Sequence, residues 1–168
     1  PVIVEAELTL EEYGNLYRDM RVVANTASKS LVTVTAVNND VDWFNEQYEN
    51  NGQSTGMIIG DNGVELLVLT KYSEVEECDG INVTFTDDSV ASAVLKKYDV
   101  TTDLAVISVN LSDISENTKA KIVKATLGNS MHLSAGTPVI AIGRADGSED
   151  SMKVGVLTST KNKQSVVD

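Results

Sequence analysis

Hydrophobic positions along the chain repeat first with the period of a helix and then with the period of a strand. Between residues 10 and 27 the apolar or aromatic positions are separated alternately by three and four residues, which places them on one face of a helix. Thr9 and Glu12 form a T-x-x-E capping box, which predicts a helix over residues 9–28. The residues of this face are Leu10, Tyr13, Tyr17, Met20, Ala24 and Ala27. Such a face either packs the helix on its own domain or serves an oligomerisation or membrane-proximal stalk helix, and the pattern leaves both interpretations open.

After Ser30 the pattern changes to short segments typical of β-strands. The expected strands are residues 31–37, 56–60, 64–70, 81–85, 90–98, 104–109, 138–143 and 152–160. Asn62 and Gly63 lie between two of them and predict a hairpin turn, because both tolerate a positive φ. Segments 104–109 and 138–143 are nearly all apolar, as in strands that are buried on both faces. Short strands separated by turn residues indicate an all-β barrel or sandwich.

Two polar segments interrupt the strands. Residues 38–53 are predicted to form a long polar loop, and residues 115–124 are predicted to hold one helical turn. The loop contains Trp43, Phe44 and Tyr48, which either pin it to the barrel or form a surface for a partner. We take these three aromatic residues as candidate binding residues.

Composition and charge exclude several classes of function. The chain has 168 residues, which corresponds to one domain, and 42% of them are hydrophobic, which is enough to build a core. The net charge of −12 repels the phosphates of nucleic acids and of anionic lipids. No apolar run approaches the roughly 18 residues of a membrane span. We therefore expect no nucleic-acid partner and no direct insertion of this segment into a membrane.

Metal-binding and redox chemistry have little support in the sequence. Cys78 is the single cysteine and His132 the single histidine, so an intrachain disulfide and a zinc site of about four such ligands are both excluded. His132 lies in a predicted surface turn without an orienting carboxylate. The spacing of one set of residues resembles a calcium loop: Asn38, Asp40, Asp42 and Glu49. Trp43, however, stands where such a loop requires glycine. We predict no metal site and no cofactor.

Six segments, in their order and spacing, resemble the first barrel of the HtrA/DegP-type trypsin-like serine proteases. They are "STGMII" (54–59), "LLVLTKYSEV" (66–75), "INVTFTDDS" (81–89), "YDVTTDLAVISV" (98–109), "LGNSMHLSAGTPVIAIG" (127–143) and "VGVLTST" (154–160). The family shows G-S-G-F-I-I, I-L-T-N-x-H-V and D-x-x-T-D-L-A-V-L at the corresponding places. "TTDLAV" and the pattern "LGNS" to "VIAIG" are specific when they occur together, and the resemblance covers residues 31–160.

The resemblance implies an incomplete catalytic site. The family's histidine follows "LT", and Ser73 stands at that position. Asp103 matches the catalytic aspartate of the motif T-D-L-A-V, and it is expected to be a vestige of the triad. The family's nucleophile is the serine of a G-N-S-G-G motif in the second barrel, and residues 1–168 contain no such motif. We expect Ser73 and Asp103 to lie close together at an edge of the barrel, with the carboxylate bound by backbone N–H groups or by the hydroxyls of Ser73 or Thr102.

The implied fold is all-β: a trypsin-like, six-stranded antiparallel β-barrel with an N-terminal α-helix and a second barrel that is largely absent. Residues 1–30 are assigned to an N-terminal segment with the capped helix and residues 31–145 to the first barrel. Residues 146–168 are assigned to the linker between the barrels and the first strand of the second barrel. A small all-β domain unrelated to proteases stays open as an alternative.

The expected function is to bind or scaffold polypeptides without cleaving them, as a pseudo-protease. A serine hydroxyl cannot replace imidazole as a base near neutral pH. The alternative is part of an active serine endopeptidase whose nucleophile and remaining site lie beyond residue 168.

The resemblance also implies a location and partners. HtrA-type proteins act outside the cytoplasm, so we expect a place in the bacterial cell envelope, with a membrane anchor upstream of this chain. The partner is expected to be a polypeptide. An apolar face left by the incomplete second barrel also predicts self-association, with residues 152–160 pairing across chains.

Overall fold

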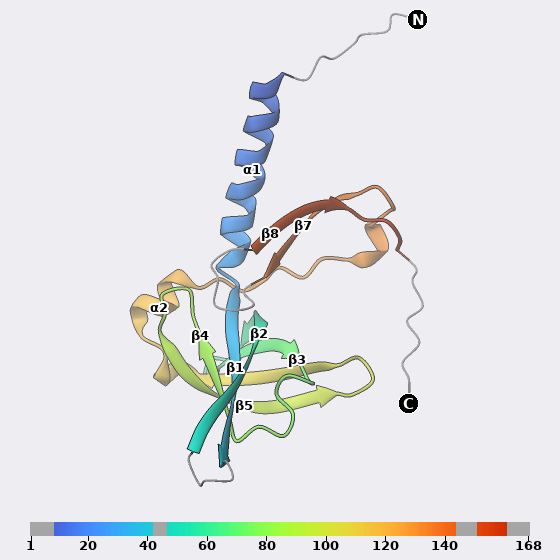
Figure 1. Ribbon diagram of the computed structural model, residues 1–168. Coiled ribbons are helices and arrows are strands. Elements are labelled where there is room, and N and C mark those ends of the chain that lie inside the picture. Colours follow the sequence, from blue (N-terminus) through green and yellow to red (C-terminus); the bar gives the residue numbers. More distant parts are fainter. Residues whose placement is uncertain (1–8, 42–46, 144–150, 161–168) are drawn as a thin grey trace, which may run out of the picture.

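Six antiparallel strands close into a barrel in the computed structural model, which describes residues 9–41, 47–143 and 151–160 (Figure 1). The strands are β1 (Leu31–Val41), β2 (Gln47–Asp61), β3 (Glu65–Lys71), β4 (Gly80–Thr84), β5 (Val90–Asp99) and β6 (Leu104–Asn110). Their order around the barrel is β1-β2-β3-β6-β5-β4, and β4 pairs back onto β1. The predicted all-β barrel with an N-terminal helix is confirmed.

Alternation along the strands fills the barrel with branched aliphatic side chains. In β3 every second residue is buried, and in β4 the same alternation turns Ile81 and Val83 inward. The fully buried side chains of the core include Val32, Val34, Ile58, Val68, Val83, Phe85, Ile107 and Val109. Gly56 lies so close to this core that a Cβ there would come within 2.7 Å of both Val34 and Val68. At Gly56 of β2 the core side chains therefore pack directly against the backbone.

The β2–β3 hairpin turns as predicted. Asn62 Oδ1 accepts hydrogen bonds from the backbone N–H groups of Val64 (3.0 Å) and Glu65 (2.7 Å), and Gly63 takes a φ of 86°. Asp61 at the end of β2 forms an ion pair with Lys124. The ion pair therefore ties the β2–β3 turn to the segment around Lys124, which follows the last strand of the barrel.

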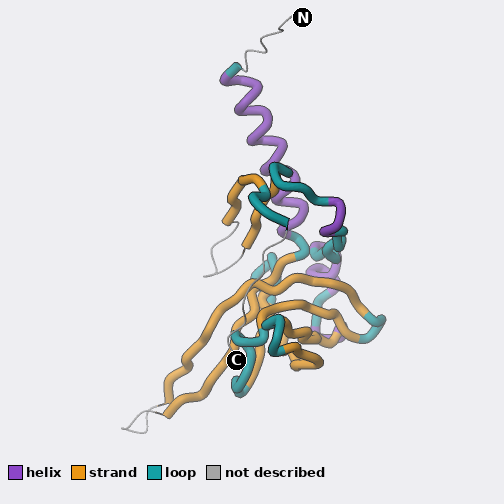
Figure 2. Tube along the Cα trace, turned by 90° about the vertical axis from the view of Figure 1, so that its right-hand side faces the viewer, coloured by secondary structure: helices purple, strands orange, loops and turns teal. Residues whose placement is uncertain are grey.

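The long polar loop predicted for residues 38–53 is wrong. Strands β1 and β2 stay paired beyond the barrel, from Val37 opposite Asn51 to Val41 opposite Gln47, while β4 pairs with β1 only as far as Val37. The result is a two-stranded arm that projects from the barrel (Figure 2). A strand that is not half-buried needs no alternation of apolar and polar residues, which agrees with the polar sequence of this segment. Trp43 and Phe44 lie outside the described residues, and Tyr48 lies in β2 with its side chain outside the description.

A hydrogen-bond network fastens the short helix α2 (Glu116–Lys121), the predicted helical turn, to the turn between β4 and β5. Asp87 accepts hydrogen bonds from the hydroxyls of Ser89 (2.7 Å) and Thr118 (3.0 Å). Lys121 adds an ion pair at 3.5 Å. The hydrogen bonds from Ser89 lower the pKa of Asp87 from 3.8 to about 2, and those from Thr118 and the charge of Lys121 contribute. The folded protein therefore stabilises the ionised form of the Asp87 carboxylate.

Strands β7 (Pro138–Gly143) and β8 (Ser151–Val156) form a separate two-stranded sheet. Residues 138–143 pair with β8 and not with a strand of the closed six-stranded barrel. The expected burial of β7 on both faces is wrong, because no residue of β7 is fully buried. β8 pairs with β7 of its own chain, so only its other edge could pair across chains, as predicted for residues 152–160.

The N-terminal helix α1 (Leu10–Ser28) begins at the predicted capping box. Thr9 Oγ1 accepts from the backbone N–H of Glu12 (3.2 Å), and the Glu12 carboxylate accepts from the backbone N–H of Thr9 (2.9 Å). The last turns of α1 contact the other described elements, and there Ala24 and Ser28 are buried. The first turns project away from the barrel (Figures 1 and 2). No helix among residues 9–41, 47–143 and 151–160 combines the length and the apolar character that crossing a membrane requires.

Candidate functional site

The end of β3 and the beginning of β6 form the candidate site. These strands pair with Lys71 opposite Leu104, so the turn after β3 lies beside the residue that precedes β6. That geometry brings Ser73 to Asp103. The backbone N–H of Tyr72 also donates to the carbonyl of Asp103 at 3.2 Å, which ties the two segments together.

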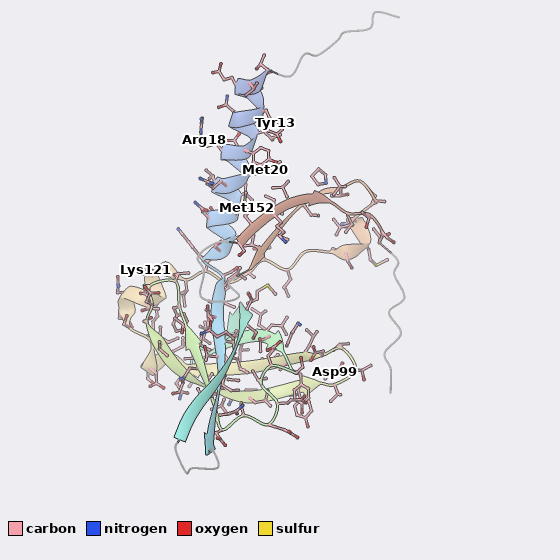
Figure 3. The ribbon with its side chains drawn as sticks, in the orientation of Figure 1. Tyr13, Arg18, Met20, Asp99, Lys121 and Met152 are labelled. Carbon is pink, nitrogen blue, oxygen red and sulfur yellow. The ribbon has the colours of Figure 1, made fainter. Side chains whose placement is uncertain are left out.

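Ser73 donates a hydrogen bond to each oxygen of the Asp103 carboxylate. Its backbone N–H donates to Oδ1 at 2.7 Å, and its hydroxyl donates to Oδ2 at 2.9 Å. The predicted proximity of the two residues at a barrel edge is confirmed. Thr102, the other hydroxyl considered as a partner of Asp103, instead donates to Asp99 at 3.0 Å. Figure 3 marks Asp99 at the end of β5.

Asp103 is held in an unusual backbone conformation. Its φ is 53°, in the left-handed region that non-glycine residues rarely adopt. The side chain is half-buried, and that of Ser73 is exposed. The hydrogen bond from the backbone N–H of Ser73, followed by the one from its hydroxyl, lowers the pKa of Asp103, and the positive charge of Lys71 adds to this. The carboxylate is therefore ionised near neutral pH.

Two tyrosines form one wall of the site. The rings of Tyr72 and Tyr98 stack with centroids 4.4 Å apart and planes 10° from parallel. Burial raises the pKa of Tyr72, and the electrostatic effects of Tyr98, Glu76 and Glu77 raise it further. Sequence reasoning missed this pair. Tyr72 directly precedes Ser73 in the sequence, but nothing in the pattern places Tyr98 of β5 against it.

Tyr72 also lines a cavity of about 380 Å³. Its apolar lining includes Val75, Ile81 and Leu95, which belong to or adjoin the barrel core. Acidic residues Glu76, Glu77 and Asp79 also line it. The cavity therefore offers an apolar surface with a negative border, next to Ser73.

Of the other residues considered in the sequence, Cys78 lines the cavity beside Tyr72, and His132 is not among the residues that line it. His132 ends a short 3₁₀ turn (Ser130–His132) and is exposed, as predicted for a surface turn. Cys78 is a free thiol that donates to the carbonyl of Val75 at 3.2 Å. Within the described ranges no group of three or more His, Cys, Asp or Glu side chains could hold a metal ion.

What the arrangement can do chemically follows from its donors and acceptors. A hydroxyl that donates to a carboxylate forms a neutral–anionic pair, and neither group accepts a proton readily near neutral pH. The pair orders the turn after β3 but offers no base. The accessible features beside it are the aromatic wall and the cavity, which suit recognition of a ligand.

Comparison with known proteins agrees with the barrel. A family described as "Trypsin-like peptidase domain" matches residues 54–167. A protein of Chlamydia trachomatis named "Probable periplasmic serine endoprotease DegP-like" is 32% identical over 117 residues, which make up 69% of this chain and 21% of that protein. The "Serine protease Do-like HtrA" of Lactobacillus helveticus is 27% identical over 133 residues, covering 73% of this chain and 30% of that protein.

A cyanobacterial relative completes the comparison. The "Putative serine protease HhoA" of Synechocystis is 28% identical over 108 residues, which make up 64% of this chain and 25% of that protein. The chain therefore spans between a fifth and a third of the length of these curated relatives.

Proposed function

The chain belongs to the trypsin-like peptidase domains of the HtrA/DegP family, and on that premise we propose that it binds polypeptides without cleaving them. The observation that carries this proposal is the pair Ser73–Asp103. In the family's motif the residue at position 73 is a histidine that faces the aspartate. Here a hydroxyl faces it, and Asp103 keeps its place as the vestige of a triad.

The chemistry of acyl transfer supports an inactive site. A serine nucleophile must lose its proton near neutral pH, and imidazole accepts it because its pKa is close to 7. The hydroxyl of Ser73 already donates its proton to Asp103, so it cannot relay one from a nucleophile. Removal of the triad base lowers turnover by roughly 10⁴–10⁶-fold in serine proteases. We infer a comparable deficit for this chain.

Recognition of a polypeptide has support next to the same pair. The relatives are named serine proteases, whose substrates are polypeptides. The cavity lined by Tyr72 presents apolar side chains next to carboxylates, which suits an extended peptide with one apolar side chain inserted. Trp43, Phe44 and Tyr48, near the end of the β1–β2 arm in the sequence, remain candidate binding residues.

One experiment measures binding and turnover on the same sample. A fluorescein-labelled unfolded polypeptide is titrated with the protein, and its anisotropy and its fragmentation are followed together. We expect saturable binding and an intact ligand. Tyr98→Ala should weaken binding, whereas Val64→Ser, an exposed apolar position on the β2–β3 turn, should not. Rapid fragmentation, or no binding at any concentration, would each refute the proposal.

An active endopeptidase is the second candidate. The curated relatives are named serine proteases, and this chain spans only part of their length. A nucleophile and the remaining site would then lie beyond residue 168, and a base other than residue 73 would serve them. Turnover that a serine-directed phosphonate abolishes in the natural full-length protein would favour this candidate.

The location and the assembly of the protein are further proposals. The relative from Chlamydia trachomatis is named periplasmic, and we propose that this chain also acts outside the cytoplasm, in a bacterial envelope. Fractionation of cells that express the natural gene tests this directly. We also propose self-association of the chain, which sedimentation equilibrium tests.

A further inference from the structure

The cavity lined by Tyr72 continues the barrel core to the surface. It has a volume of about 380 Å³, and its walls come from the turn after β3, the beginning of β4 and the middle of β5. Val75 and Ile81 in its lining are buried members of the core, and Ala93 and Leu95 pack against that core. Ligand pockets of proteins measure about 300–1,000 Å³. An apolar side chain that entered this cavity would therefore extend the core by one residue.

The border of the cavity is acidic and uncompensated. Glu76, Glu77 and Asp79 line it, and none of the described residues that line the cavity is basic. The side chains of Glu76 and Glu77 are exposed. Their carboxylates form no ion pair or hydrogen bond with another residue that the structure describes. Both carboxylates are therefore available to a cation of a partner.

The charge of this border acts on the wall of the cavity. Burial raises the pKa of Tyr72, and the charges of Glu76 and Glu77 are among the causes that raise it further. A potential that disfavours a tyrosinate favours a cation at the same place. The net charge of −12 adds a long-range attraction for cationic chains. The electrostatics of the cavity thus select among the polypeptides that its apolar lining could accept.

We propose that the polypeptide bound at this cavity carries a lysine or arginine one or two residues away from the apolar side chain that enters it. This inference rests on the proposed function and specifies its ligand. Adjacent residues of an extended chain are about 3.3 Å apart along the chain, so a basic side chain at this spacing reaches Glu76 or Glu77. A neutral neighbour leaves both carboxylates without a partner, and an acidic neighbour is repelled by them.

Four peptides of equal length, each labelled with an uncharged fluorophore, separate the two parts of this preference. The first carries leucine flanked by lysines, and in the second and third glutamine or glutamate replaces the lysines. The fourth keeps the lysines and has serine in place of leucine. Anisotropy titrations should show that the first peptide binds about three- to tenfold more tightly than the glutamine peptide, because exposed ion pairs are individually weak. The serine peptide should also bind less tightly than the first, and the glutamate peptide should bind least.

Two double variants with the same change in net charge locate the preference. Glu76→Gln/Glu77→Gln removes the border carboxylates and should bring the affinities of the lysine and glutamine peptides within about twofold of each other. Glu11→Gln/Asp19→Asn removes two exposed carboxylates from α1, no residue of which lines the cavity, and should keep the preference. Circular dichroism checks that both variants keep the fold. An equal loss in both would assign the preference to the overall charge and overturn the proposal.

The thiol of Cys78 reports where the peptide binds. Cys78 is the single cysteine of the chain and lines the cavity. A peptide seated there should slow the alkylation of this thiol by N-ethylmaleimide at pH 8, which the intact mass of the protein follows. Binding without protection, or a thiol that does not react even in the free protein, contradicts a peptide in this open cavity.

The outcomes separate this inference from the proposed function. If the lysine, glutamine and glutamate peptides bind equally, polypeptide binding stands and the charge preference is refuted. If the serine peptide binds as tightly as the first, insertion of an apolar side chain is refuted. If the peptides are cleaved with the expected preference, the proposed function fails and this inference stands. If none of the peptides binds, both are refuted.

Discussion

Ser73 holds both carboxylate oxygens of Asp103, one with its backbone N–H at 2.7 Å and the other with its hydroxyl at 2.9 Å. The two residues are thirty positions apart in the sequence and meet because β3 pairs with β6. In this fold a histidine at position 73 would face the same carboxylate. One residue thus supplies two of the hydrogen bonds that hold the carboxylate of Asp103.

Replacement of Ser73 by alanine distinguishes the effects of the two hydrogen bonds on the pKa of Asp103. The backbone N–H bond to Asp103 remains, and the hydroxyl bond is lost. We expect the pKa of Asp103 to rise but to stay below its ordinary value, because its largest cause, the N–H bond, is preserved. NMR titration of the carboxyl carbon in the wild type and in Ser73→Ala measures this. An unchanged pKa would show that the hydroxyl bond is not formed in solution.

Gly56 should tolerate no side chain. A Cβ at this position meets Val34 and Val68 at 2.7 Å, so Gly56→Ala must displace core side chains. We expect a loss of about 1–3 kcal/mol in the free energy of unfolding, as is typical of overpacked cores. Gly60→Ala in the same strand has open space around its Cβ and serves as the control. Equal urea midpoints for the two variants would contradict the packing.

Thr118 should be the most sensitive residue of α2. Its side chain is buried, and its hydroxyl is within hydrogen-bond distance of Asp87, Ser89 and Ser115. Thr118→Val keeps the shape and leaves these partners unsatisfied, so we expect a loss of about 1–3 kcal/mol in unfolding free energy. Thr102→Val, which removes one exposed hydrogen bond to Asp99, should cost far less. Urea denaturation measures both variants.

The same network predicts how stability depends on acid. The pKa of Asp87 is lowered from 3.8 to about 2 in the folded protein, so the unfolded chain binds the proton more tightly. Asp87 therefore stabilises the fold above pH 3.8, and this contribution is lost as the pH falls through about 2. Asp87→Asn should be less stable than the wild type near neutral pH, and the difference should shrink in this acid range. A constant difference across the range would refute the lowered pKa.

The sequence predicted the features that depend on local patterns or on an order of segments that resembles a known family. The capping box at Thr9 and Glu12 fixed the start of α1, and the Asn62–Gly63 turn fixed one hairpin. The proximity of Ser73 to Asp103 followed from the resemblance to a family whose motif places these positions together. Each of these depends on few residues close in sequence, or on a pairing that the motif already contains.

The features that the sequence did not reveal depend on contacts between a segment and distant parts of the chain, which the segment's own residues do not encode. Residues 38–53 extend two strands past the barrel, and polar residues on both faces of a strand look the same as a loop. The apolar run of β7 suggested burial on both faces, but its only strand partner among the described residues is β8. The stack of Tyr72 on Tyr98 joins β5 to the turn after β3, and no local pattern encodes that contact.

The most direct test of the central claim is covalent labelling with a fluorophosphonate, which reacts only with a serine that a base has activated. The natural full-length protein is incubated with the probe, and its intact mass is measured, with an active trypsin-like protease as the positive control. We predict that the protein remains unlabelled, because Ser73 offers no base to a nucleophile. Stoichiometric labelling of one serine would contradict the account.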